Sequence, residues 1–500
     1  MDWTRIEVAG IPTFWSEGQG PLKAGLIFRV GHADETLATR GITHLVEHLA
    51  LHPIGQPAHH YNGQVDAITT AFTTEGSPDE VADFLSSICR SLHDLPVDRL
   101  KVENRILQTE EDGRRAGPLG ALLLWRYGAA TYGLPGYEEF GIGLHTPEQL
   151  GAWGRRWFTQ GNAVLALIGG PPPEGLRLEL PAGERIAPPA PSSALPRTPA
   201  YFNEQLNGVA MLSAVPRSAA AQAYSLLLAR RLHRTLRQDS GISYSPTADY
   251  MPRDTGTAHV TAFADGLEDS HAKLIAQFVE EIERLATEPG AQDELDKIIT
   301  QMRARVSDPE AIAGVAVGAA MRELLGSEPL DRAALLAEID ALDARAVQET
   351  AAQALDAALL MLPRGHEPQG RRFHMAPASS PGTVDGRTLR SADAPIDRDR
   401  LIIGPEGVSL VHGPRYVTVK FSACEAMLAW PDGARRLYGR DGFSLHLEPT
   451  LWENGGSIPE ALDRAVPADR VIPQQARSED HIPQPRTSRL ERARARLKRR

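Results

Sequence analysis

The sequence is poor in cysteine and has no long apolar run. Only Cys89 and Cys424 occur in 500 residues, and neither belongs to a CxxC motif. A thiolate zinc site is therefore excluded, a disulfide framework is not expected, and a reducing, cytoplasmic location is favoured. No stretch approaches the roughly 20 apolar residues that span a bilayer. The N-terminal MDWTRIEVAGIPTFW lacks the basic and apolar regions of a signal peptide.

Basic residues are also in deficit, except at the C-terminus. The formal net charge is −11. The last fifteen residues, RTSRLERARARLKRR, carry a net charge of +7, which leaves −18 on the rest of the chain. The body of the chain should repel nucleic acid, whereas the tail is expected either to contact an acidic partner or to act only as a solubilising segment.

The chain is too long for one hydrophobic core, and two stretches rich in proline, glycine or polar residues divide it. Alternating strand and helix patterns on either side of the first stretch predict two similar αβ domains, although no clear sequence repeat relates them. Short β-runs between turn signals follow the second stretch. The predicted units are a first domain over 1–170, a Pro-rich linker over 171–199, a second domain over 200–363, a linker over 364–398, a small β module over 399–449, and a disordered segment with the basic tail over 450–500.

Local signals define several elements of the first domain. Ser77, Pro78 and Glu80 have the spacing of a capping box with proline at the first helical position, and predict a helix that begins there. The run Val65–Thr74 predicts a strand, and residues 97–114 predict another helix.

The segment GITHLVEHLAL, residues 41–51, adds two histidines and a glutamate to an amphipathic pattern. Residues three and four apart share a helix face, so His44 and His48 can reach one metal ion. Two imidazoles, a carboxylate and a water form a catalytic zinc set. Glu47 lies beside these ligands and can act as a general base. Histidines on a solvated helix face would produce the same pattern.

A third ligand is expected from a separate helix. KVENRILQTEED supplies Glu103 and Glu110, seven residues apart and so about 10.5 Å apart on one helix face. Only one of them can bind the same metal ion, and the other can orient a ligand. A solvated acidic face is the alternative interpretation.

Several segments, in order along residues 1–365, resemble one protein family. HxxEH is the inverzincin order of the zinc-binding motif. Five stretches, the first of which contains this motif, resemble segments of the pitrilysin, insulysin and mitochondrial processing peptidase family: VGHADETLATRGITHLVEHLAL, GQVDAITTAFTTE, ENRILQTE, GNAVLALIGG and LRQDSGISYSPTADYMPRDTG. The resemblance implies an α+β fold, with two αβ domains that each contain an antiparallel sheet flanked by helices. The chain would be a half-size member, half of a clamshell, with an extra C-terminal module.

The resemblance also implies an activity and a ligand set. It implies a zinc-dependent endopeptidase that hydrolyses peptides or unfolded segments held as an added β-strand. His44, His48 and Glu110 become the ligands of one Zn2+ per chain, and Glu103 becomes a residue that orients them. Glu47 becomes the base that activates zinc-bound water.

Four further residues are implied to bind substrate. Asp66 and Ala67 lie in the segment that resembles the substrate-edge strand, where Asp66 replaces the asparagine usual in the family. Arg237 and Tyr244 resemble the pair that reaches the scissile bond from the second domain. A helix-end charge and a strand aromatic residue are the structural alternative for this pair.

The loop over 52–62 is shorter than in the family, which could open the site. Its histidines, His52, His59 and His60, could indicate a second metal site, although solvated loop positions explain them more simply.

Family members enclose peptides between two halves, and this chain supplies one half. The zinc ligands and the Arg237–Tyr244 pair both occur in this chain. A homodimer is therefore expected, with a heterodimer of related subunits as the alternative. A catalytically silent subunit that binds peptides or serves as a scaffold is a competing function. Another is a tether to an acidic partner, nucleic acid or an anionic membrane, provided by the β module and basic tail in the C-terminal third of the chain.

Overall fold

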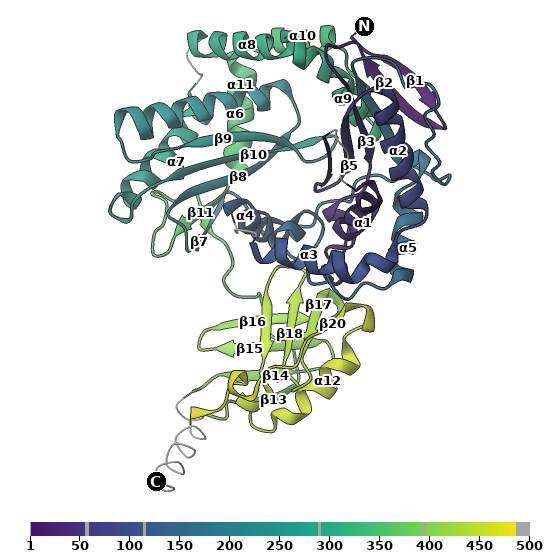
Figure 1. Ribbon diagram of the computed structural model, residues 1–500. Coiled ribbons are helices and arrows are strands. Elements are labelled where there is room, and N and C mark those ends of the chain that lie inside the picture. The colour runs from purple at the N-terminus through teal and green to yellow at the C-terminus, as the bar shows by residue number, and fades with distance from the viewer. Residues whose placement is uncertain (1, 56–59, 114–116, 289–291, 394–396, 487–500) are drawn as a thin grey trace, which may run out of the picture.

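The computed structural model describes residues 2–55, 60–113, 117–288, 292–393 and 397–486. They form two αβ lobes and a C-terminal β module, which lies beside the first lobe (Figure 1). None of the helices in these ranges has the length and apolarity that crossing a membrane requires. The expected basic tail beyond residue 486 lies outside the described residues.

The first lobe is built on a six-stranded sheet with the order β1-β2-β6-β3-β5-β4. Only β2 and β6 run parallel; the other neighbours are antiparallel. Its strands are β1 Thr4–Val8, β2 Ile11–Ser16, β3 Leu22–Phe28, β4 Tyr61–Val65, β5 Thr70–Gly76 and β6 Ala163–Ile168. Its helices are α1 Ile42–Leu51, α2 Pro78–His93, α3 Leu100–Gly113, α4 Pro118–Tyr127 and α5 Pro147–Trp157.

The second lobe repeats this topology without a visible sequence repeat. Its sheet has the order β12-β7-β11-β8-β10-β9. The five strands β2-β6-β3-β5-β4 of the first sheet correspond to β7-β11-β8-β10-β9 of the second. In both sets, the neighbours across the sheet are the first, last, second, fourth and third strands in sequence order. The strands are β7 Ala200–Glu204, β8 Gly208–Pro216, β9 Thr247–Pro252, β10 Thr257–Asp265, β11 Leu359–Pro363 and β12 His374–Met375. The helices are α6 Ala219–Leu232, α7 His271–Thr287, α8 Gln292–Ser307, α9 Pro309–Leu324, α10 Arg332–Asp340 and α11 Ala344–Asp356. The predicted α+β class, with antiparallel-rich sheets flanked by helices, is confirmed.

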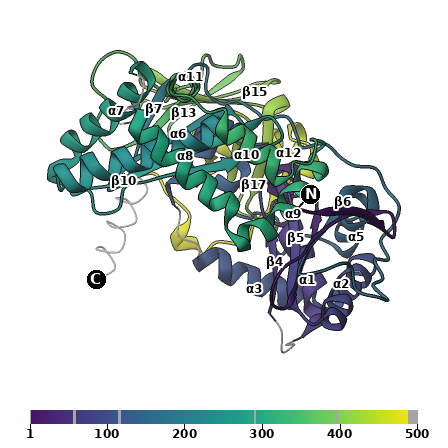
Figure 2. The same ribbon diagram turned by 90° about the horizontal axis from the view of Figure 1, so that it is seen from above.

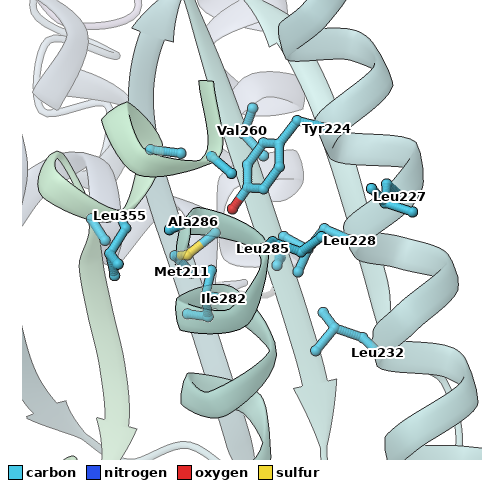
Figure 3. Close-up of a cluster of buried hydrophobic side chains, with 14 of the residues drawn as sticks. Met211, Tyr224, Leu227, Leu228, Leu232, Val260, Ile282, Leu285, Ala286 and Leu355 are labelled. Atoms are coloured by element: carbon cyan, nitrogen blue, oxygen red, sulfur yellow. The ribbon is translucent and has the colours of Figure 1, made fainter. Parts of the chain in front are cut away.

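The core of the second lobe lies between its sheet and α6, α7 and α11. Tyr224 and Leu228 of α6 meet Ile282 and Leu285 of α7 over Met211 of β8 (Figure 3). These apolar residues recur every three or four positions, so each helix turns one continuous stripe toward the sheet.

Each lobe contributes a helix that packs on the sheet of the other lobe. Helix α9 follows the second-lobe sheet strands β7–β10 in sequence, yet Ala316 and Ala320 pack on Phe14 and Val164 of the first sheet. Helix α4 belongs to the first half of the chain, but Trp125 stacks on Phe202 of β7, with 4.8 Å between the ring centroids. The two sheets are thus joined through shared cores and not only through the connecting chain.

The strand predicted over Val65–Thr74 is wrong in its bounds. The chain turns over residues 66–69, where the Asp66 N–H donates to the Thr69 carbonyl at 2.8 Å. It forms a hairpin of β4 and β5, with Tyr61 opposite Thr74. This turn contains neither glycine nor proline, which are the strongest local signals of a turn. The capping box at Ser77 is confirmed: its hydroxyl accepts from the Glu80 N–H, and the Glu80 carboxylate accepts from the Ser77 N–H.

The C-terminal module is larger than predicted. It contains two four-stranded sheets, β13-β14-β15-β16 and β19-β18-β17-β20. The bounds are β13 Arg387–Arg390, β14 Arg400–Ile403, β15 Gly407–His412, β16 Arg415–Lys420, β17 Cys424–Ala429, β18 Arg435–Gly439, β19 Ser444–Leu447, β20 Val471–Pro473 and α12 Ile458–Ala465.

The prediction of disorder from residue 450 is therefore wrong as far as residue 486. Helix α12 buries Ile458 and Leu462 in the module core, and β20 pairs in parallel with β17. A helix of two turns carries too little periodicity to stand out between proline-rich flanks. The two predicted linkers, 171–199 and 364–398, also pack on or pair with the lobes. Leu178 is buried in the first-lobe core, and β12 extends the second sheet.

We expect Phe14→Ala to destabilise both lobes together. Phe14 is fully buried between the first sheet and α9, and truncation of a buried phenylalanine costs about 3–5 kcal/mol of unfolding free energy. Urea denaturation followed by circular dichroism measures the loss. Ile6→Ala, at a position of the neighbouring β1 that is 38% exposed, is the control and should have a much smaller effect. Equal effects of the two substitutions would contradict the shared core.

Candidate metal centre

A buried carboxylate fixes the beginning of α1. Glu35 accepts hydrogen bonds from the N–H groups of Gly41 and Thr43, at 3.1 and 3.0 Å. It also pairs with Arg40 at 3.2 Å. Burial raises the pKa of Glu35, although Arg40 and the two N–H groups favour its charged form. The helix N-terminus, where partial positive charge gathers, is thus held by an acidic group.

Helix α1 brings the predicted histidines together. Leu45, Val46 and Leu49 are buried in the first-lobe core, so the opposite face presents His44 and His48 with 4.9 Å between the ring centroids. Glu47 is also buried, and one ligand atom from each of these three polar residues lies within 4.8 Å of the others.

Helix α3 lies beside α1 in both views (Figures 1 and 2) and brings both predicted glutamates to the histidines. Glu110 Oε2 lies 3.7 Å from His44 Nε2 and 3.8 Å from His48 Nε2. Glu103 is buried and lies on the other side of His48, with Oε2 3.4 Å from Nδ1. A carboxylate at Nδ1 retains the proton there and leaves the Nε2 lone pair directed toward Glu110.

Glu139, which was not among the predicted residues, contacts His44 as Glu103 contacts His48. Glu139 Oε2 lies 3.3 Å from His44 Nδ1, and its Oε1 lies 3.9 Å from Arg40 Nη2. Burial opposes ionisation of Glu139, but the His44 hydrogen bond and the Arg40 charge lower its pKa to about 2. Ninety-five positions separate Glu139 from His44, so no local spacing marks this pair.

The environments of the three polar residues of α1 differ. Burial lowers the pKa of His48, and the charge of His44 lowers it further. Burial acts in the same direction on His44, but the Glu139 carboxylate outweighs it and raises the pKa. Burial, together with Glu110 and Glu103, raises the pKa of Glu47 to about 7. A carboxyl group with that pKa can exchange a proton near neutral pH.

The open edge of the first sheet lies beside α1. Strand β4 ends the sheet and pairs with β5 on one side. A Cβ at Gly63, in the middle of β4, would collide with Glu47 Oε1. Glycine is therefore needed here for the strand to approach the glutamate. An extended chain paired with this edge would run close to Glu47 and the two histidines.

Asp66 and Ala67 directly follow β4. Their backbone carbonyls accept hydrogen bonds from His32 and Ala33, at 3.0 and 2.7 Å, and the Asp66 side chain accepts from Gln64. These contacts shape the turn at the end of the edge strand, and the role of both residues in substrate binding stays a prediction.

Arg237 and Tyr244 contact each other in the second lobe. Arg237 lies in the π-helical continuation of α6, residues 233–239, and donates from Nη1 to the Tyr244 carbonyl at 2.7 Å. Its guanidinium carbon lies 4.8 Å from the centre of the Tyr244 ring, and the Tyr244 side chain is 74% exposed. Within the described ranges, neither residue has a hydrogen bond or an ion pair with His44, His48 or Glu110.

The loop after α1 is only partly described. Its residues 56–59, which include His59, lie outside the described residues. His52 Nδ1 lies 3.9 Å from Glu103 Oε1, which places His52 beside the residue that contacts His48.

Comparisons with known proteins give the fold a name. No protein-family model matches the sequence, and no curated protein matches it. Solved structures do match. A protease from Helicobacter pylori is 16% identical and aligns over 72% of this chain and 99% of its own, with a TM-score of 0.60. An inactive peptidase M16 domain from Pseudomonas fluorescens is 14% identical over 74% and 100%, with a TM-score of 0.62.

The chain has the M16 peptidase fold. The periplasmic protease PqqL from Escherichia coli is 13% identical, and the alignment covers 88% of this chain but 56% of that one, with a TM-score of 0.57. The chain therefore corresponds to about half of such a protein and to nearly all of the two smaller ones. Proteases and an inactive domain thus share this fold.

Glu47 should make the stability of the metal-free protein depend on pH. Its pKa of about 7 in the fold exceeds the ordinary value of 4.5, so the folded state holds the proton more tightly than the unfolded chain does. The contribution of Glu47 to stability should therefore fall as pH rises from about 4.5 to 7 and then level off. In chelator-treated protein at pH 8, we expect Glu47→Gln to be more stable than wild type by roughly 1–3 kcal/mol. The difference should vanish near pH 4.5. Urea denaturation at both pH values measures it, and a constant difference would contradict the raised pKa.

Proposed function

We propose that the chain is a zinc-dependent endopeptidase that hydrolyses peptides or unfolded protein segments. The observation that carries the proposal is the convergence of His44 Nε2, His48 Nε2 and Glu110 Oε2, with the buried Glu47 beside them. These are the donor types of a catalytic zinc site, two imidazoles and a carboxylate.

The distances and charges of this group fit a zinc ion. Zinc binds histidine nitrogen and carboxylate oxygen at about 2.0–2.2 Å, which separates tetrahedral ligands by ~3.3–3.6 Å. The observed separations of 3.7 and 3.8 Å are only slightly wider. Arg40 pairs with Glu139, and Arg99 pairs with Glu103. Among the described residues, Glu47 and Glu110 have no arginine or lysine partner, and a divalent cation would offset their charge.

Glu47 is the proposed general base. A zinc ion held by the three ligands would act as a Lewis acid on the scissile carbonyl. Glu47 would take a proton from the attacking water and deliver it to the leaving amine. Burial of Glu47 disfavours its charged form, and this favours transfer of the proton from water to the carboxylate.

Strand β4 is the proposed substrate-binding edge. A peptide added there forms backbone hydrogen bonds, which place few demands on its sequence. Gly63 lets this edge lie next to Glu47, so the added strand would pass its scissile bond close to the base. Asp66 and Ala67, at the end of β4, would mark one end of the bound segment.

Arg237 and Tyr244 are proposed to act from a second copy of the chain. Their mutual contact presents an exposed phenol from the second lobe, and a phenol or guanidinium can stabilise a developing oxyanion. A homodimer would supply this pair to each metal centre and would close the half clamshell into a chamber. A heterodimer with a related subunit would serve the same purpose.

Glu47→Gln should retain zinc and lose hydrolysis. Removal of a general base costs about 10²–10⁴-fold in rate, whereas the three ligands are unchanged. Zinc content by elemental analysis and cleavage of a quenched fluorescent peptide measure the two properties. Glu17→Gln, at an exposed position, is the control and should match wild type. Full hydrolysis by Glu47→Gln would reject the assigned base. A wild-type protein that binds peptide but does not hydrolyse it would favour the silent peptide-binding subunit.

Two inactive variants should restore activity when mixed. If Tyr244 acts across a homodimer, an unfolded and refolded equimolar mixture of Glu47→Gln and Tyr244→Ala contains heterodimers with one intact site. Random pairing then predicts roughly a quarter of wild-type activity. Each variant refolded alone is the control. If refolding succeeds and the mixture stays inactive, Tyr244 does not act across a homodimer.

A further inference from the structure

The C-terminal module packs on the segment that carries Glu139. The ring of Tyr438, in β18, lies 5.8 Å from that of Tyr137 in an edge-to-face contact and 5.4 Å from that of Phe140. Tyr137 precedes Glu139 by two positions, and Phe140 follows it directly. One module side chain therefore contacts both sides of the segment that reaches His44.

This contact is part of a buried interface. The Ala129 N–H donates to the Arg440 carbonyl at 3.1 Å. A Cβ at Gly128, which has a φ of +73°, would collide with that same carbonyl. An apolar cluster fills the rest of the interface, with four buried residues from each side: Leu37, Ala129, Leu134 and Tyr137 from the first lobe, and Ala426, Leu428, Tyr438 and Ile472 from the module.

The same cluster lies close to the partner of Glu139. Leu37 is fully buried in it and precedes Arg40 by three positions. The Arg40 guanidinium pairs with Glu139, and the Arg40 carbonyl accepts from the Gly141 N–H at 3.0 Å. The module therefore supports both members of the Arg40–Glu139 pair.

We propose that Tyr438 is a positioning residue for the metal centre. By holding Tyr137 and Phe140, it keeps Glu139 at His44 Nδ1 and so keeps His44 Nε2 directed toward His48 and Glu110. The metal-binding part of this inference rests on the proposed function. Residues that orient a ligand in this way typically change metal affinity by 10–100-fold when they are lost.

The module interface can be perturbed without emptying the module core. The interior of the module is a separate cluster that includes Leu401, Leu437 and Leu462. Tyr438 lies in the interface cluster, whereas Leu462 lies in the module interior. Leu462→Ala is therefore a matched control that removes buried packing from the module but leaves the contact with residues 137–140.

The first test compares zinc affinities, measured on the full chain by competition with a chromogenic chelator. We expect Tyr438→Ala and Glu139→Gln each to weaken zinc binding by about tenfold or more. The double variant should lose little beyond the larger single effect, because both substitutions act through one contact. Tyr438→Phe, which keeps the ring, and Leu462→Ala should bind like wild type. Wild-type affinity in Tyr438→Ala, or fully additive losses, would overturn the proposal. So would an equal loss in Leu462→Ala.

The second test does not depend on zinc. Hydrogen exchange of the segment 137–146, in metal-free protein, should accelerate in Tyr438→Ala but not in Leu462→Ala. The Ile142 N–H donates to the Glu139 carbonyl, and the Gly141 N–H donates to the Arg40 carbonyl, so both amides report on the place of this segment. Unchanged exchange would overturn the proposed bracing. If wild type binds no zinc, the proposed function fails. The exchange data alone then decide whether the module fixes this segment.

Discussion

The candidate site depends on carboxylates placed at the Nδ1 atoms of two histidines. Glu103 and Glu139 come from different parts of the chain, yet each lies within 3.4 Å of one imidazole of α1. Each contact fixes a ring orientation and directs both Nε2 atoms toward Glu110. Without these contacts the two rings could rotate, and three donors would not converge. The remaining architecture brings α1, α3 and the segment around Glu139 to one point.

The two lobes are held in a fixed arrangement because each packs a helix on the sheet of the other. Helix α9 covers the first sheet, and α4 packs on the second. An alanine-rich surface on α9 lets the helix lie close to the strands, and a stacked Trp125–Phe202 pair ties α4 to β7. Interiors packed in this way resist relative movement because any shift opens cavities. The orientation of the second lobe, and with it the place of Tyr244, is thus linked to the sheet that carries β4.

The C-terminal module also packs on the first lobe. Sequence patterns describe it as a separate β unit behind a linker, but Tyr438 and its neighbours are buried against the first lobe. Linkers at both domain boundaries also contribute, since Leu178 is buried and β12 joins a sheet. Proline-rich composition predicts the absence of regular structure well, but it does not predict whether a segment packs on the surface beside it.

The sequence by itself determined the local features. The capping box at Ser77 and the helical face of His44 and His48 follow from spacing within one turn or two, where backbone geometry allows few alternatives. The shared face of Glu103 and Glu110 follows in the same way. Only the tertiary structure decided that Glu139 contacts His44 and that Tyr438 contacts the segment around Glu139. These contacts join residues that are distant in sequence, and their energy comes from packing between elements, which no local pattern encodes.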